Sequence, residues 1–194
     1  MKRVLLSICA VCLSLLVLGG CGNKQLSYEE VVKEGFENND GSKILDIYNE
    51  ATEQEDVLEI EELIIQGFDH ERNEVAKLTP EEMVLQENKY VDFIMLSDKD
   101  MEYTDSISKA AGIFKLDTEA ANGTISIPVD EACSHLYWVL DGRRNYRIAQ
   151  DLLKEGKKAE AKERLEKARK SLNTSYNGQD VLATIIDEQL VELK

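Results

Sequence analysis

Residues 149–172 read AQDLLKEGKKAEAKERLEKARKSL and show most clearly which kind of fold this chain adopts. The small and apolar residues of this stretch recur at three- and four-residue steps, the spacing of an amphipathic helix. Gly156 interrupts the pattern, and glycine often ends a helix because it tolerates a left-handed backbone. The stretch therefore predicts two helices joined by a short turn at Gly156.

The segment 148–172 is similar to one helical hairpin of the tetratricopeptide repeat family. The matching positions are Ala149, Leu152, Gly156, Ala161, Leu165 and Ala168. The match departs from the family at Asn145, where a large aromatic residue is usual, and at Asn173, where proline often follows. Stable repeat arrays need about three units. This chain has one reasonable match to the repeat at 148–172 and a weaker one at 37–51. A degenerate repeat array and an unrelated helical bundle with one such hairpin both stay open.

The rest of the chain shows further helical periodicity and little strand pattern. Ser27-Tyr28-Glu29-Glu30 and Thr79-Pro80-Glu81-Glu82 both resemble capping boxes, in which Ser or Thr precedes Glu by three residues at a helix start. Helices are predicted from Ser27 to the turn at 38–41, from a Ser42 cap to about 51, from 53 to about 78, after Thr79 with a break near 97–98, from an Asp130 cap to Gly156, over 159–172, and after the turn at 177–178.

Residues 115–128 lack a helical period. An extended loop closed by Pro128 is the first interpretation, and one short strand through Ile125, Ile127 and Val129 is the other. Taken together, the pattern predicts an all-α fold: antiparallel helical hairpins, six or seven helices in all, in a single domain over residues 27–194.

The N-terminal residues have a different character. Lys2 and Arg3 precede the uncharged run VLLSICAVCLSLLVLGG, which ends at Cys21. A positive start, an apolar centre and small residues at the end are typical of a secretory signal peptide. The last four residues, Leu18-Gly19-Gly20-Cys21, resemble the lipobox of bacterial lipoproteins, although Gly19 stands where Ala, Ser, Thr or Val is usual.

The lipobox resemblance implies that residues 1–20 are a signal peptide, that Cys21 is acylated and that residues 21–26 are a lipidated tether. The protein would then be held at the extracytoplasmic face of the cell membrane. Two alternatives remain. The run 4–20 is near the lower length limit of a transmembrane anchor. An ordinary secreted protein would carry Cys21 as a free thiol, with Cys133 as its one possible disulfide partner.

Charge is distributed unevenly along the chain, whose formal net charge is −15. Residues 22–131 hold 28 acids and 9 bases, whereas residues 143–170 hold 11 bases and 5 acids. A strongly acidic chain predicted to lie outside the cytoplasm is not expected to bind nucleic acid. Within the basic stretch, Arg143, Arg144 and Arg147 have few nearby acids, so these three residues are the predicted partner-binding cluster.

No residue pattern predicts catalysis, and we expect no enzyme activity, cofactor or metal. His70 begins like a zinc-protease motif, but Glu74 stands where the second histidine belongs. His135 lies in an amphipathic pattern and is interpreted as a core or boundary residue. The acids from Asp98 onward lack the glycine and the final carboxylate of a calcium loop. Cys133 lies among apolar residues and is expected to be a buried, inert thiol.

The sequence thus predicts a membrane-anchored bacterial lipoprotein whose helical domain is a protein–protein interaction or scaffold module at the cell envelope. The alternative is an envelope protein that binds a small molecule or a cell-wall fragment. A concave surface with exposed Tyr28, Tyr48, Tyr137 or Trp138 would favour the first function. A closed apolar cavity would favour the second, and clustered titratable residues would favour catalysis.

Overall fold

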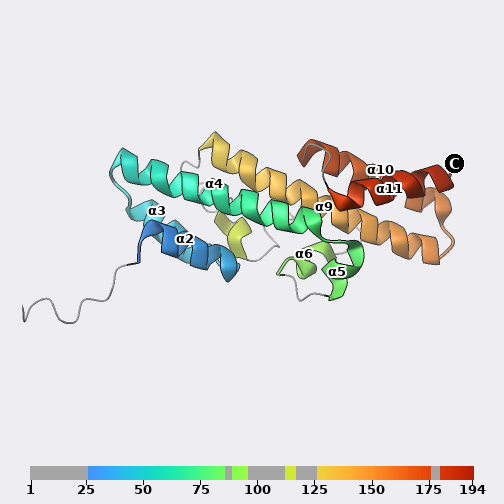
Figure 1. The fold of residues 1–194 in the computed structure, drawn as a ribbon, viewed down its shortest axis with the longest axis horizontal. Helices are drawn as coiled ribbons and strands as arrows, with labels where there is room; N and C mark the ends of the chain where they lie inside the picture. The colour runs from blue at the N-terminus through green and yellow to red at the C-terminus, as the bar shows by residue number, and fades with distance from the viewer. Residues whose placement is uncertain (1–25, 86–88, 96–111, 117–125, 176–179) are drawn as a thin grey trace, which may run out of the picture.

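A computed structural model describes residues 26–85, 89–95, 112–116, 126–175 and 180–194. Within these ranges the chain forms helices and no strands, which confirms the predicted all-α class (Figure 1). No described helix is both long and apolar enough to span a membrane. The signal-like segment with Cys21 and the calcium-loop candidate at 98–109 lie outside the described residues.

Two long helices form the axis of the molecule, and shorter helices pack around them (Figure 1). The helices are α2 (Tyr28–Glu37), α3 (Ser42–Glu50), α4 (Gln54–Lys77), α5 (Pro80–Leu85), α6 (Val91–Met95), the 3-10 turn η1 (Gly112–Phe114), α9 (Ile127–Lys154), α10 (Lys158–Ser175) and α11 (Val181–Glu192). Helix α9 packs against α4, α6 and α10, while α2 packs against α3 and α4. Helix α9 is therefore shared by the N-terminal and C-terminal parts of the fold.

The direction of the two axial helices differs from a simple antiparallel arrangement. Helices α9 and α10 form the antiparallel hairpin that the sequence predicts, and α11 turns back along α10 (Figure 1). Helices α4 and α9, in contrast, run in the same direction (Figure 1). Because parallel neighbours need a long connection, the chain between them has room for α5, α6 and η1.

Both predicted capping boxes are present. The Ser27 hydroxyl accepts a hydrogen bond from the Glu30 amide at 3.2 Å, and the Glu30 carboxylate accepts one from the Ser27 amide at 2.9 Å. Thr79 and Glu82 make the same reciprocal pair at 3.2 and 2.7 Å. Each box satisfies amide donors that the first turn of a helix leaves without a carbonyl partner. The starts of α2 and α5 are thus fixed by local sequence.

Two predicted helix starts were wrong. Helix α3 is capped at Gly41 rather than Ser42, and the Ser42 amide donates to the Asp40 carboxylate at 3.0 Å. That hydrogen bond lowers the pKa of Asp40. Helix α9 begins at Ile127 after Ser126, so Pro128 lies in the first helical turn, where its missing amide hydrogen costs nothing. The loop or strand predicted through Pro128 is replaced there by helix; residues 117–125 lie outside the description.

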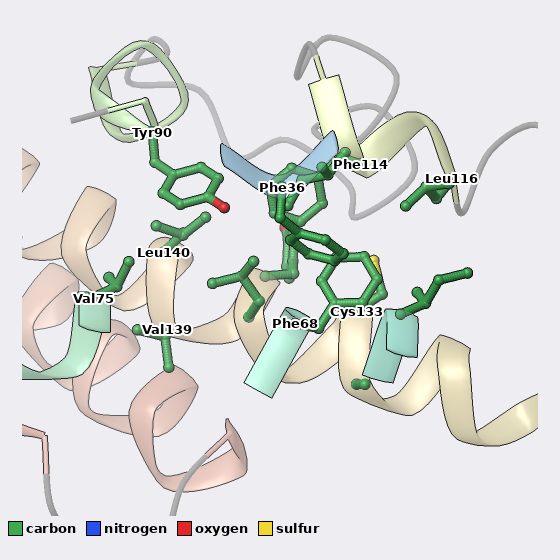
Figure 2. Packing of buried hydrophobic residues seen from close by; sticks show 14 of the residues in the cluster. Phe36, Phe68, Val75, Tyr90, Phe114, Leu116, Cys133, Val139 and Leu140 are labelled. Atoms are coloured by element: carbon green, nitrogen blue, oxygen red, sulfur yellow. The ribbon is translucent and has the colours of Figure 1, made fainter. Parts of the chain in front are cut away.

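The first hydrophobic core lies between α2, α3, α4, α6, η1 and the first half of α9. Phe36 and Phe68 meet edge to face, with ring centroids 5.1 Å apart, and Figure 2 shows both rings in a cluster with Phe114. Cys133 lies in the same cluster and is buried, as predicted. Large aromatic side chains therefore supply much of the apolar area buried here.

A second core lies between the C-terminal half of α9, α10 and α11. Small residues let the backbones of α9 and α10 approach closely: Ala149, Ala161 and Ala168 are fully buried. A Cβ atom on Gly142 would lie 2.7 Å from the Leu172 side chain, so a larger residue there would require that side chain to shift. The small and apolar positions predicted for this hairpin are confirmed as its interface.

The turn of the hairpin has the hydrogen bonds of a Schellman motif. The Gly156 amide donates to the Leu153 carbonyl at 3.0 Å, and the Lys157 amide donates to the Leu152 carbonyl at 2.9 Å. Gly156 adopts φ +77°, in the left-handed region. This conformation satisfies the last carbonyls of α9 and reverses the chain into α10.

We expect Gly156→Ala to lower the free energy of unfolding by about 1 kcal/mol, because a Cβ atom strains a left-handed residue. No atom lies within 4 Å of that Cβ position, so strain rather than a clash is the cause. Gly156→Asn is the matched control and should lose less, since asparagine adopts this conformation more readily. Urea unfolding of the full chain measures both; an alanine variant as stable as the parent would contradict the expectation.

Candidate functional site: an apolar groove along α9

The three arginines predicted to bind a partner do not share one surface. Arg143 and Arg144 are each only 4% exposed. Arg147, one turn further along α9, is partly buried and lines a surface groove. The predicted cluster was therefore wrong for Arg143 and Arg144, whose guanidinium groups are occupied inside the protein.

Arg143 pairs with a residue far away in the sequence. Its Nη1 and Nη2 atoms donate to the two carboxylate oxygens of Asp180, at 2.7 and 3.2 Å. Nη2 also donates to the carbonyl of Val75 at 2.7 Å and to that of Leu78 at 3.3 Å. Asp180 in turn accepts from the Leu182 amide at 2.8 Å and so caps α11. One guanidinium group thus joins the ends of α4 and α11 to α9.

Arg144 belongs to a buried polar network within the α9–α10 hairpin. It forms an ion pair with Asp141, whose carboxylate also accepts from the Asn145 amide group at 3.0 Å and from the Ser171 hydroxyl at 2.7 Å. Arg164 of α10 donates to the Asn145 side-chain oxygen at 3.2 Å. Asn145 therefore links α9 to α10 by hydrogen bonds inside the hairpin.

Arg147 lines a groove of about 570 Å³ that lies between α5, α6 and the C-terminal half of α9. The lining is mostly apolar and consists of Leu78, Pro80, Glu81, Met83, Val84, Leu85, Val91, Ile94, Arg143, Tyr146, Arg147, Gln150, Asp151, Lys154 and Leu182. Its volume falls in the range of about 300–1,000 Å³ that is common for ligand pockets. The groove is open to solvent rather than enclosed.

Local sequence explains how the groove is built. The capping box at Thr79 starts α5 immediately after α4 ends, which turns Met83 inward. Ile94 of α6 and Leu182 of α11 are also buried and line the same groove. Tyr146 contributes its ring, and burial raises the pKa of its hydroxyl. Four separate chain segments and the α4–α5 junction thus form one apolar surface.

One edge of the groove carries apolar side chains in solvent. Val84 is 57% exposed and Leu85 is 82% exposed, and both lie on α5. Isolated exposed apolar residues are common on proteins. Two adjacent ones that continue the lining of an apolar groove form a contiguous patch, and such patches mark interaction sites.

The opposite wall carries charge. Lys154 pairs with Asp151 at 2.8 Å, and both side chains are largely exposed. Arg147 makes no hydrogen bond or ion pair with any other described residue. Glu81 and Asp151 also line the groove, but neither makes an ion pair with Arg147. The groove therefore offers apolar surface and one partly buried guanidinium group that has no direct ion pair among the described residues, a combination that can bind an apolar group carrying an anion.

The aromatic residues singled out in the sequence do not line this groove. Tyr137 is buried in the first core, while Tyr28, Tyr48 and Trp138 are partly buried and pack against that core. The Tyr48 hydroxyl donates to Glu61 at 2.9 Å, and burial together with this hydrogen bond raises its pKa to about 12. Exposed aromatic side chains therefore do not mark the candidate binding surface. The groove uses aliphatic residues of α5 instead.

The other candidate functional residues do not come together in one site. His70 is exposed on α4, and His135 is partly buried on α9. In the parts of the chain that the structure describes, no three His, Cys, Asp or Glu side chains are grouped to hold a metal ion. The groove is thus the strongest candidate functional site among the described residues.

No protein-family model, curated protein or solved structure matches this chain. The function must therefore be argued from the groove and from the N-terminal sequence.

We expect Asp180→Ala to lower the free energy of unfolding by about 3–5 kcal/mol, because it leaves Arg143 buried without its counter-charge. Asp180→Asn keeps a capping oxygen for α11 and so separates the charge from the cap. Asp187→Ala removes a more exposed ion pair with Arg169 and is the control, with an expected loss of at most about 1 kcal/mol. Urea unfolding measures all three. If Asp180→Asn proves as stable as the parent, the ion pair does not hold α11 in place.

Proposed function

We propose that this protein is a membrane-anchored bacterial lipoprotein whose helical domain binds a protein partner at the cell envelope. The observation that carries the proposal is the open apolar groove along α9, with Val84 and Leu85 exposed at its edge. Exposing these side chains gives the folded domain no packing energy, whereas covering them with a partner removes apolar area from water.

The anchor rests on the sequence. Lys2, Arg3 and the apolar run before Cys21 support secretion, and Leu18-Gly19-Gly20-Cys21 supports acylation of Cys21. Two or more acyl chains on one residue would hold the domain stably on a membrane, whereas a single chain binds only marginally. The proposed location is the extracytoplasmic face of the cell membrane. That the protein is not an enzyme remains a prediction, and the hairpin keeps both of its interpretations, a degenerate repeat array and an unrelated helical bundle.

A second candidate function is the binding of a small molecule or cell-wall fragment. The volume of the groove, about 570 Å³, favours it, because a ligand of ordinary metabolite size would fit. The exposed edge favours a protein partner instead, since a small molecule inside the groove would leave Leu85 in water.

We expect Cys21→Ala to move the protein from the membrane fraction to the soluble fraction of cells that express the full chain. The reason is that the thiol is the proposed site of acylation. Metabolic labelling with a clickable fatty acid provides the second measurement, and the label should appear on the parent and not on the variant. A variant that stays in the membrane fraction, or a parent without label, would contradict the lipoprotein assignment.

We expect Leu85→Asp to reduce crosslinking between the protein and its main partner in intact cells by about tenfold or more, because a charge replaces an apolar contact at the groove edge. Leu58→Asp is the matched control. Leu58 is 55% exposed near the start of α4, away from the groove. Crosslinked products are isolated in detergent and identified by mass spectrometry. Equal capture by both variants would show that the partner contacts another surface.

A further inference from the structure

We infer that the groove takes a short amphipathic helix of a partner protein, and that this helix carries a carboxylate that pairs with Arg147. The inference rests on the proposed function and specifies the chemistry of the partner. Three properties of the groove support it: the length and periodicity of its α9 wall, the unpaired guanidinium group in that wall, and the exposed apolar edge opposite.

The α9 wall has the length of a short helix. Its lining residues, from Arg143 to Lys154, follow the three- and four-residue spacing of a single helical face. At about 1.5 Å of rise per residue this face extends for about 16 Å, or three helical turns. A partner helix laid along it would place apolar residues at i, i+3 or i+4 and i+7 into the groove, which is the usual form of helix-in-groove recognition.

Charge selects the acidic partner. Arg147 is partly buried and has no ion pair with another described residue. Two acids line the groove with it: Asp151 is paired with Lys154, and Glu81 makes no ion pair with Arg147. A carboxylate can receive two parallel hydrogen bonds from one guanidinium group, and this geometry adds specificity as well as attraction. Residues 143–170 are also the basic part of an otherwise acidic chain, so the local field favours an anionic segment there.

The exposed edge favours a helix over a free acyl chain. Buried Met83, Ile94 and Leu182 line the inside of the groove, and an acyl chain lying against them would leave the edge uncovered. A helix has a diameter of about 10 Å with its side chains. It can therefore contact the inner lining and cover Val84 and Leu85 at the same time.

The test is a selection from a phage-displayed library of short random peptides on the full chain, purified in detergent and immobilised. Selections run in parallel on the parent, on Arg147→Glu and on Lys158→Glu, an exposed charge change at the start of α10 that leaves the groove intact. Enriched peptides are synthesised, and their affinities for all three proteins and for Leu85→Asp are measured by fluorescence anisotropy.

The expected result is enrichment of peptides with helical apolar spacing and an acidic residue at a constant offset. Arg147→Glu should bind these peptides about tenfold or more weakly and should select a basic residue at that offset, because the charge reversal turns attraction into repulsion. Lys158→Glu should behave like the parent, and Leu85→Asp should lose affinity.

Two results would overturn the inference. If the enriched peptides show the same charge preference on the parent and on Arg147→Glu, Arg147 does not pair with a carboxylate of the partner. The groove could in that case still bind the partner crosslinked in cells. If no peptide is enriched and a fluorescent fatty acid binds saturably, the occupant of the groove is not a helix, and the small-molecule function is favoured. The in-cell crosslinking with Leu85→Asp tests the proposed function separately.

Discussion

The guanidinium group of Arg143 lies where the two halves of the fold meet, and most of the architecture depends on it. It binds the carboxylate that caps α11 and two carbonyl groups at the end of α4. The last carbonyls of a helix lack their usual partners within the helix; the Val75 carbonyl accepts one hydrogen bond from the Leu78 amide, and Arg143 gives it a second and also binds the Leu78 carbonyl. Its own charge is acceptable in the interior because Asp180 neutralises it with two hydrogen bonds. Because Arg143 also lines the inner end of the groove, the same contact fixes the shape of the candidate site.

Helix α9 connects the two hydrophobic cores because its buried residues change character along its length. The first half supplies large side chains such as Leu136 and Tyr137 to the aromatic core. Beyond Gly142, small residues allow α10 to approach. Because α9 is one continuous helix of 28 residues, it fixes the position of one core relative to the other. The groove forms beside the second half, where α5 and α6 reach α9 but leave part of its surface uncovered.

Local sequence predicted the features that depend on a few neighbouring residues. The capping boxes at Ser27 and Thr79, the turn at Gly156 and the buried alanines of the α9–α10 hairpin all follow from spacings of three to five residues. The contacts that define the site are not local. Arg143 reaches Asp180 across 37 residues and Val75 across 68, so counting nearby acids could not show that this arginine is buried. The groove needs four helices together, and the exposed Val84 and Leu85 were indistinguishable in sequence from core residues.

The start of the described chain and the groove lie toward opposite ends of α4, and this separation bears on how a partner is reached. Tyr28, near the start of the described chain, lies against Asp56 in the first turn of α4, while the groove begins beyond the last turn of α4 at Leu78. Helix α4 rises about 33 Å between these points at about 1.5 Å per residue. If Cys21 is in the membrane as proposed and α4 points away from the lipid, the domain would be a spacer that presents the groove at up to about that distance from the lipid surface. A partner helix would then be captured beyond the headgroup region, where the negative surface potential of a membrane is already screened within about 8–10 Å and the pairing of Arg147 with a carboxylate does not compete with anionic lipid.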